Sequence, residues 1–273
     1  MRQFNLLYEI DGSRRFNTQT RRLEANPGDS DDYEQSVTDV FQTISNNKVV
    51  GQKILNANLF TSVRVMPWTG VADAQTVPIN VAASMKAGQV APDPKRPNHL
   101  IQGTGRGTDS VIFFNPEVSH EVSGPAMKLD QILVHEIIHS IRMGAGLVER
   151  KQMGSDWGEF EEFVAVVIAN VYCSETRPGS SLRDGVRGQF CGSLGCYSNI
   201  SLEARDLNRF TIRYANELNQ IYDEMDALCY WLSLSQATFN PFRIIKAQRD
   251  NANPWNKPTD MAAVKKLFGP GLP

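Results

Sequence analysis

The sequence predicts an α+β fold, with a small mixed sheet in the first half of the chain and a helical C-terminal part. Three observations predict it. Short strand-like runs are found before residue 115, and apolar residues at helical spacing dominate after residue 128. The 273 residues are 41% hydrophobic and 21% charged, which is typical of a globular protein. We expect one compact unit, in which a helical region over residues 201–273 packs on a region formed by residues 1–200.

Alternation of apolar and polar residues marks the first half of the chain. It predicts strands at Phe4 to Ile10, Thr61 to Pro67, Val77 to Val81 and Ser110 to Phe114. A helix is expected from Asp31 to roughly Leu55, because apolar residues recur there at helical spacing. Between Ala87 and Thr108 proline and glycine accumulate, which predicts a loop or a flap instead of a regular element.

Helical spacing marks the second half. Pro125 is suited to the first turn of a helix, and a wide apolar stripe that begins at Leu129 carries this helix to about Arg142, where Gly144 and Gly146 can end it. The next helix is apolar on most faces and therefore expected to be buried. This helix is predicted from Trp157 to Cys173. After it we expect a loop from Arg177 to Gly195 and helices at Glu203 to Trp231, Pro241 to Gln248 and Asp260 to Phe268.

Charge and hydropathy exclude several classes of partner. The formal net charge of -2 gives no electrostatic reason to expect nucleic acid. No window approaches the ~18 to 20 apolar residues of a membrane span, so no membrane partner is expected. Asn5, Glu9 and Asp11 interrupt the N-terminal apolar residues, so we expect no general secretory signal. Delivery outside the producing cell would then need another route, such as a specialised secretion system.

The cysteines do not form the C-x2-C pairs of a structural zinc site. Cys191 and Cys196 bracket a short loop and would be able to pair in an oxidising compartment. Without a secretory signal we expect reduced thiols. The same expectation covers Cys173 and Cys229.

The chemistry lies in the run His135-Glu136-Ile137-Ile138-His139, an H-E-x-x-H motif on the predicted helix. Residues four apart lie on one helix face, so the two imidazoles can converge on one ion at about 2.0 to 2.1 Å. Glu136 would project beside the metal and act as general base toward a metal-activated water. The apolar neighbours draw this helix into the core, where polar groups need partners. A metal supplies them.

A catalytic zinc needs a third protein ligand and leaves the fourth position to water. The metzincin extension is excluded, because Arg142 and Ala145 stand where it needs Gly and His. The remaining histidines, His99 and His120, both precede the motif, so a carboxylate is expected. Successive helical residues point about 100° apart, so only one of an adjacent pair would face the metal. The candidates are Glu159, Glu161 and Glu162.

The motif, followed by Glu161-Glu162-Phe163-Val164-Ala165, resembles the gluzincins, zinc metallopeptidases whose third ligand is a Glu on the helix after the motif helix. The resemblance covers roughly residues 108 to 175 and implies a zincin-like fold, one Zn²⁺ and Glu162 as the third ligand. The strand before Asn115-Pro116 also looks like the corresponding region of bacterial effector and toxin metalloproteases. That likeness implies a secretion-system or immunity partner. Val166 stands where some of these toxins place a second acid.

The expected activity is that of a zinc-dependent metalloendopeptidase acting on a protein or peptide. Its substrate is expected to lie extended along an edge strand near Val111 to Phe114. Two alternatives remain, a zinc-binding interaction module without activity and a zinc amidase acting on peptidoglycan peptides. Supporting roles stay open: Tyr172, Tyr197, Arg187 and Arg142 are candidates to stabilise an oxyanion, and Asn170, Ser174 and Glu175 to bind a liganding histidine.

Overall fold

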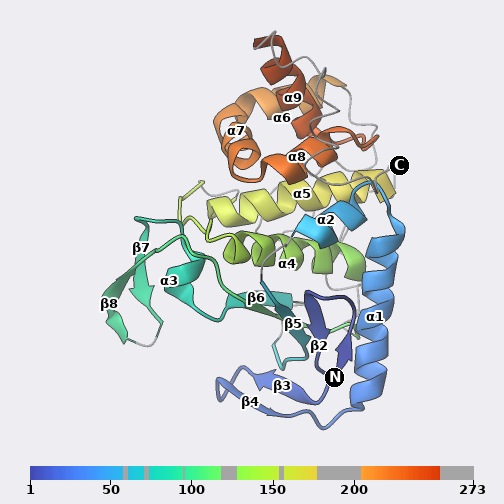
Figure 1. The fold of residues 1–273 in the computed structure, drawn as a ribbon, viewed down its shortest axis with the longest axis vertical. Helices are drawn as coiled ribbons and strands as arrows, with labels where there is room; N and C mark the ends of the chain where they lie inside the picture. Colours follow the sequence, from blue (N-terminus) through green and yellow to red (C-terminus); the bar gives the residue numbers. More distant parts are fainter. Residues whose placement is uncertain are drawn as a thin grey trace.

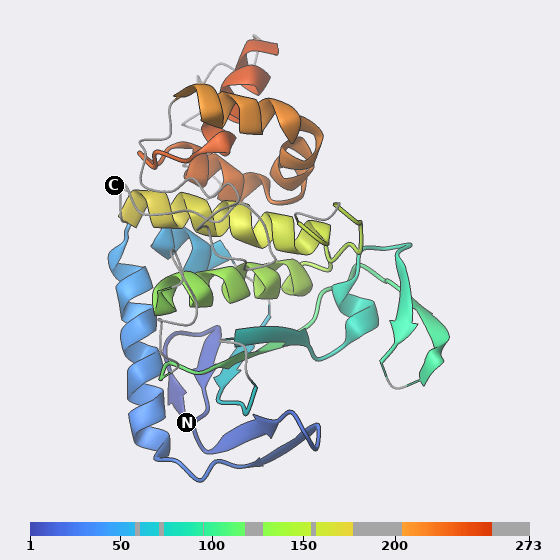
Figure 2. The ribbon, with the colours of Figure 1, turned by 180° about the vertical axis from the view of Figure 1, so that it is seen from behind.

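The computed structural model describes residues 1–57, 61–70, 74–94, 96–117, 128–153, 157–176 and 204–252. Figures 1 and 2 show a layered molecule, with a sheet below helix α4 (Leu129–Gly144), helix α5 (Phe160–Thr176) above α4, and the C-terminal helices on top. The predicted α+β class is confirmed.

The main sheet is mixed and has the order β1-β2-β5-β9-β6. Its three inner strands are parallel, and β1 and β6 pair antiparallel at the two edges. Ile112 of β9 is opposite Val65 of β5 on one side and Thr76 of β6 on the other. The strands are β1 (Arg2–Gln3), β2 (Tyr8–Ile10), β5 (Val63–Met66), β6 (Ala74–Pro78) and β9 (Ser110–Phe114).

This strand order corrects two predictions. The expected edge strand at Val111 to Phe114 is β9, which lies inside the sheet, and the edge is β6. The expected single strand from Phe4 to Ile10 is a reversal instead, because the side-chain oxygen of Asn5 accepts the backbone N–H groups of Leu7 and Tyr8 and turns the chain.

The helix predicted from Asp31 to Leu55 is two helices, α1 (Ser30–Asn46) and α2 (Gly51–Ala57). The side chain of Asn47 accepts the N–H groups of Val50 and Gly51, so it competes with the helical hydrogen bonds at this point. Similarly, Asn80 ends the run after β6 by capping the short helix α3 (Val81–Ser84).

Two hairpins stand apart from the main sheet. One, β3 (Arg14–Asn17) with β4 (Arg22–Ala25), was not predicted. The other, β7 (Val90–Asp93) with β8 (Arg96–Gln102), is a regular element where a loop or a flap without regular structure was predicted between Ala87 and Thr108. It projects from the body in Figure 2. Each strand of such a ribbon pairs on one side only, which is the setting in which a sheet tolerates proline.

The C-terminal helices also divide more finely than predicted. The expected helix from Glu203 to Trp231 is α6 (Ala204–Arg213), α7 (Ala215–Glu224) and α8 (Asp226–Ser233). Tyr214 and Met225 leave helical geometry between them. Helix α9 (Pro241–Ala252) contains the predicted segment from Pro241 to Gln248. The predicted helix at 260–268, the loop at 177–195 and Pro125 lie outside the described residues.

One hydrophobic cluster runs from the sheet through α4 and α5 into the C-terminal helices. Every residue of α4 from Asp130 to Arg142 is buried, so the motif helix lies inside this cluster. Cys173 and Cys229 are both buried, while Cys191 and Cys196 lie outside the described residues. None of the described helices combines the length and the apolar character that crossing a membrane requires.

Candidate metal centre

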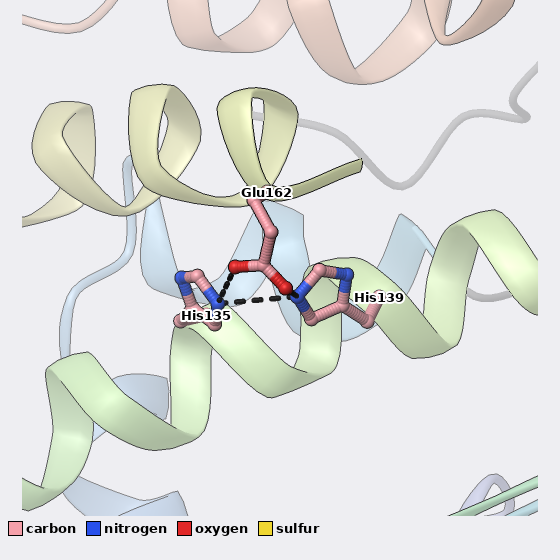
Figure 3. A group of neighbouring side chains, drawn as sticks. All are labelled: His135, His139 and Glu162. Carbon is pink, nitrogen blue, oxygen red and sulfur yellow. Dashed lines mark hydrogen bonds and ion pairs between the residues drawn. The ribbon is translucent and has the colours of Figure 1, made fainter. Parts of the chain in front are cut away.

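Three predicted side chains meet between α4 and α5. His135 and His139, one turn apart on α4, point toward Glu162 in the first turn of α5 (Figure 3). The Nε2 atoms of the two histidines are 3.1 Å apart. Glu162 places Oε2 3.3 Å from His135 Nε2 and Oε1 3.4 Å from His139 Nε2. The structure thus brings together two imidazole nitrogens and one carboxylate.

These separations fit a single metal ion. A tetrahedral zinc at about 2.0 to 2.1 Å from each ligand holds its ligand atoms roughly 3.3 Å from one another. The two Nε2 atoms, 3.1 Å apart, lie close to that value, and each is 3.3 or 3.4 Å from a different oxygen of Glu162. Counting one ligand atom from each residue, the three atoms lie within 4.8 Å of one another. Among the residues that the structure describes, no fourth His, Cys, Asp or Glu joins the group. Three protein ligands with one position left open is the arrangement of catalytic zinc sites.

The electrostatics of the group favour a cation. Both histidines are buried, with 8% and 9% of their surface exposed, whereas Glu162 is half-buried. Burial alone lowers the pKa of His139, but the hydrogen bond and charge of Glu162, helped by Glu136 and Glu161, raise it from 6.5 to about 9. Burial alone would raise the pKa of Glu162, but its hydrogen bonds to His135 and His139 lower that pKa below the usual value. In the metal-free protein a proton on His139 therefore supplies positive charge at this place.

The adjacent acids Glu161 and Glu162 point in different directions. Glu161 turns to Arg142, which donates from Nε to Oε2 at 2.8 Å and from Nη2 to Oε1 at 2.9 Å. Glu162, about 100° further around the helix, faces the histidines. Glu159 lies before the start of α5 and bridges to Gln152. Of the three predicted candidates, only Glu162 belongs to the group.

Glu136 lies beside the group and is not part of it. Its Oε2 accepts a hydrogen bond of 2.6 Å from the hydroxyl of Thr76 on the edge strand β6. That hydroxyl is also 3.1 Å from the backbone oxygen of Glu136. The carboxylate is 8% exposed and held in place by a neighbouring element of the fold. The role of Thr76 is not predictable from the sequence, because Thr76 and Glu136 are 60 residues apart and no local pattern joins them.

Three of the residues predicted to support the site, Tyr172, Arg142 and Ser174, contact groups outside the three candidate ligands. Tyr172 donates its hydroxyl to Asp130 at 2.8 Å, and the guanidinium of Arg142 is bound to carboxylates. Ser174 bonds through Oγ to the backbone of Phe239. Asn170 is buried in α5, and Glu175 lies in its last turn. Tyr197 and Arg187 fall outside the described residues, as does His120, while His99 is exposed on β8.

No protein-family model matches the sequence, and no curated protein matches it. The functional assignment therefore depends on the geometry and chemistry of this site.

The raised pKa of His139 predicts how the metal-free protein responds to pH. Its ion pair with Glu162 stabilises the fold fully below the unfolded-state pKa of 6.5, and this contribution is lost as the pH rises through about 9. We expect the melting temperature of chelator-treated protein to fall across this interval. The fall should be smaller in His139→Gln, which has no proton to lose there.

Thermal melts followed by circular dichroism between pH 6 and 9.5 measure this dependence. His99→Gln, at an exposed position on β8, is the matched control and should follow the wild type. Equal slopes for His139→Gln and wild type would contradict the expected ion pair.

Proposed function

We propose that this protein is a zinc-dependent endopeptidase of the zincin type, with one Zn²⁺ held by His135, His139 and Glu162. One observation carries the proposal. Two nitrogens and one carboxylate from two helices converge closely enough to share one metal ion, beside an acid outside that set. A structural zinc site would have no use for Glu136 in that place and would close the fourth position with a further ligand.

The chemistry divides between the metal and the side chains around it. A zinc ion bound here would lower the pKa of a coordinated water toward ~7 and polarise a carbonyl group. Glu136 would accept the proton of the attacking water and later deliver it to the leaving amine. The hydroxyl of Thr76 would keep the carboxylate oriented for both transfers, since it is bonded to Oε2.

The substrate is proposed to be a protein or peptide in extended conformation. Among the described strands β6 ends the sheet order, so one side of it pairs with β9, and the other is proposed as an edge to which a peptide can add as a further strand. Thr76 in this strand contacts Glu136, which places the edge next to the site. The resemblance to bacterial effector metalloproteases supports a role as an effector or toxin with a protein target in another cell.

The test is metal analysis of the purified protein combined with digestion of an unfolded protein such as reduced casein. We expect one zinc per chain, loss of hydrolysis when a chelator removes the metal, and recovery when one equivalent of zinc returns. Purified protein that binds no divalent metal at micromolar concentration would contradict the site. Zinc binding without hydrolysis of casein would favour an interaction module, and cleavage of peptidoglycan peptides alone would favour an amidase.

A further inference from the structure

Helix α4 turns a third functional side chain toward α5. His135, His139 and Arg142 follow at positions i, i+4 and i+7, so they share one face of the helix. Two adjacent acids in the first turn of α5 lie opposite this face. Glu162 contacts the histidines, and Glu161 contacts Arg142. The ligand and its neighbour are therefore bound to the same helix, one turn apart.

Arg142 is fully buried, with 0% of its side chain exposed, and each of its five N–H donors has a partner. Two donors form a fork on Glu161, at 2.8 and 2.9 Å. The others reach Glu224 Oε2 at 2.9 Å, the Leu147 backbone oxygen at 2.8 Å and the Met225 sulfur at 3.8 Å. Such a set fixes the orientation of the guanidinium plane.

The fork also fixes Glu161. Its Oε1 accepts the backbone N–H of Glu149 at 2.8 Å as well as one Arg142 donor, and Oε2 accepts the other. Glu161 is 7% exposed, so little of its surface is open to solvent. Because successive residues of a helix are about 100° apart, a fixed Glu161 sets the rotation of the first turn of α5. That rotation decides where Glu162 points.

The second carboxylate on Arg142 comes from the C-terminal helices. Glu224, at the end of α7, also accepts Lys86 Nζ at 2.8 Å and Gln220 Nε2 at 2.9 Å through Oε1. Helix α7 is thus joined to α4 through a partly buried ion pair whose residues are 82 positions apart in sequence. In Figure 1 the C-terminal helices lie on the far side of α5 from the sheet.

We propose that Arg142 is a positioning residue for the metal ligand Glu162, acting through Glu161, and that Glu224 of α7 completes this support. The C-terminal helices then take part in setting the metal site. The inference rests on the proposed function, because it takes Glu162 to be a ligand. The inference goes beyond the proposed function because it predicts that removing a charge from α7 weakens metal binding.

The test uses two variants of the network and one control. Arg142→Lys keeps the charge but lacks the planar fork, so it cannot hold Glu161 with two parallel bonds. Glu224→Gln removes the charge contributed by α7. Glu217→Gln is the matched control, because Glu217 is also on α7 and pairs at 3.2 Å with Lys151, outside the contacts of Arg142.

Zinc affinity is measured by competition with a chromophoric chelator, and ligand geometry by the visible absorption of the Co²⁺-substituted protein. Circular dichroism at saturating metal checks that each variant is folded. We expect zinc affinity to fall about 10- to 100-fold in Arg142→Lys and roughly 3- to 10-fold in Glu224→Gln, with a changed Co²⁺ spectrum in both. Glu217→Gln should match the wild type.

Wild-type affinity and an unchanged Co²⁺ spectrum in folded Glu224→Gln and Arg142→Lys would overturn the inference while leaving the metal site in place. If Arg142→Lys does not fold, Glu224→Gln decides alone. A wild-type protein that binds neither Zn²⁺ nor Co²⁺ would remove the proposed function and the inference with it.

Discussion

The Glu136→Gln variant should keep its zinc and lose hydrolysis by about 10²- to 10⁴-fold, the usual contribution of a general base. The amide has nearly the shape of the carboxylate, and its oxygen can still accept the Thr76 hydroxyl, so the fold around the site is preserved. What it lacks is the ability to take a proton. Metal content and initial rates of casein cleavage, measured on the same preparation, separate the two effects.

Glu9→Gln is a suitable control, since Glu9 pairs with Arg64 on an outer part of the sheet and has no contact with the metal group. It should leave both the zinc content and the rate unchanged. Wild-type hydrolysis by Glu136→Gln would remove the mechanism. Loss of zinc from that variant would instead mean that Glu136 acts as a ligand.

The second large effect is expected from Glu162→Gln, which should weaken zinc binding by more than the roughly 10- to 100-fold typical of residues that only support a ligand. Glu162 is half-buried and its partners are the two histidines, so above about pH 9, where the ion pair with His139 is lost, the metal-free protein should melt within a few degrees of the wild type. Zinc competition assays and thermal melts of chelator-treated protein give the two quantities.

Glu161→Gln should act first on stability. It leaves the buried Arg142 with one carboxylate fewer, and breaking one side of a buried ion pair costs about 3 to 5 kcal/mol. Calorimetry or denaturant unfolding of the metal-free protein measures this cost. Tight stoichiometric zinc in Glu162→Gln, with zinc lost from a folded Glu161→Gln, would reverse the assignment of the two acids.

The parts of the site that depend on local sequence could be predicted. The H-E-x-x-H spacing places both imidazoles on one face of α4 whatever the rest of the fold does. The acidic start of α5 narrowed the third ligand to a few residues, and the resemblance to gluzincins pointed to Glu162. The sequence pattern alone does not distinguish Glu161 from Glu162 as a metal ligand. The structure does, because Glu161 is bound to Arg142, which lies 19 residues earlier.

Non-local pairing explains most of what was missed or wrong. The order of strands along the sheet leaves no trace in the pattern of a single strand, so β9 was taken for an edge although it lies between β5 and β6. Helical periodicity continues across Tyr214 and Met225, so the divisions between α6, α7 and α8 were invisible to it. Thr76 and Glu224 lie 60 and 82 residues from the side chains they bind.

Through Thr76, the proposed peptide-binding strand β6 also contacts the proposed general base. A peptide aligned on β6 would be placed by the same five-residue element that orients the Glu136 carboxylate. The same strand would then position both the peptide bond to be cleaved and the carboxylate that takes the proton, so a shift of the strand would move both together. Peptide binding and the orientation of Glu136 would then be coupled, because pairing with a new strand also restrains the backbone that carries Thr76.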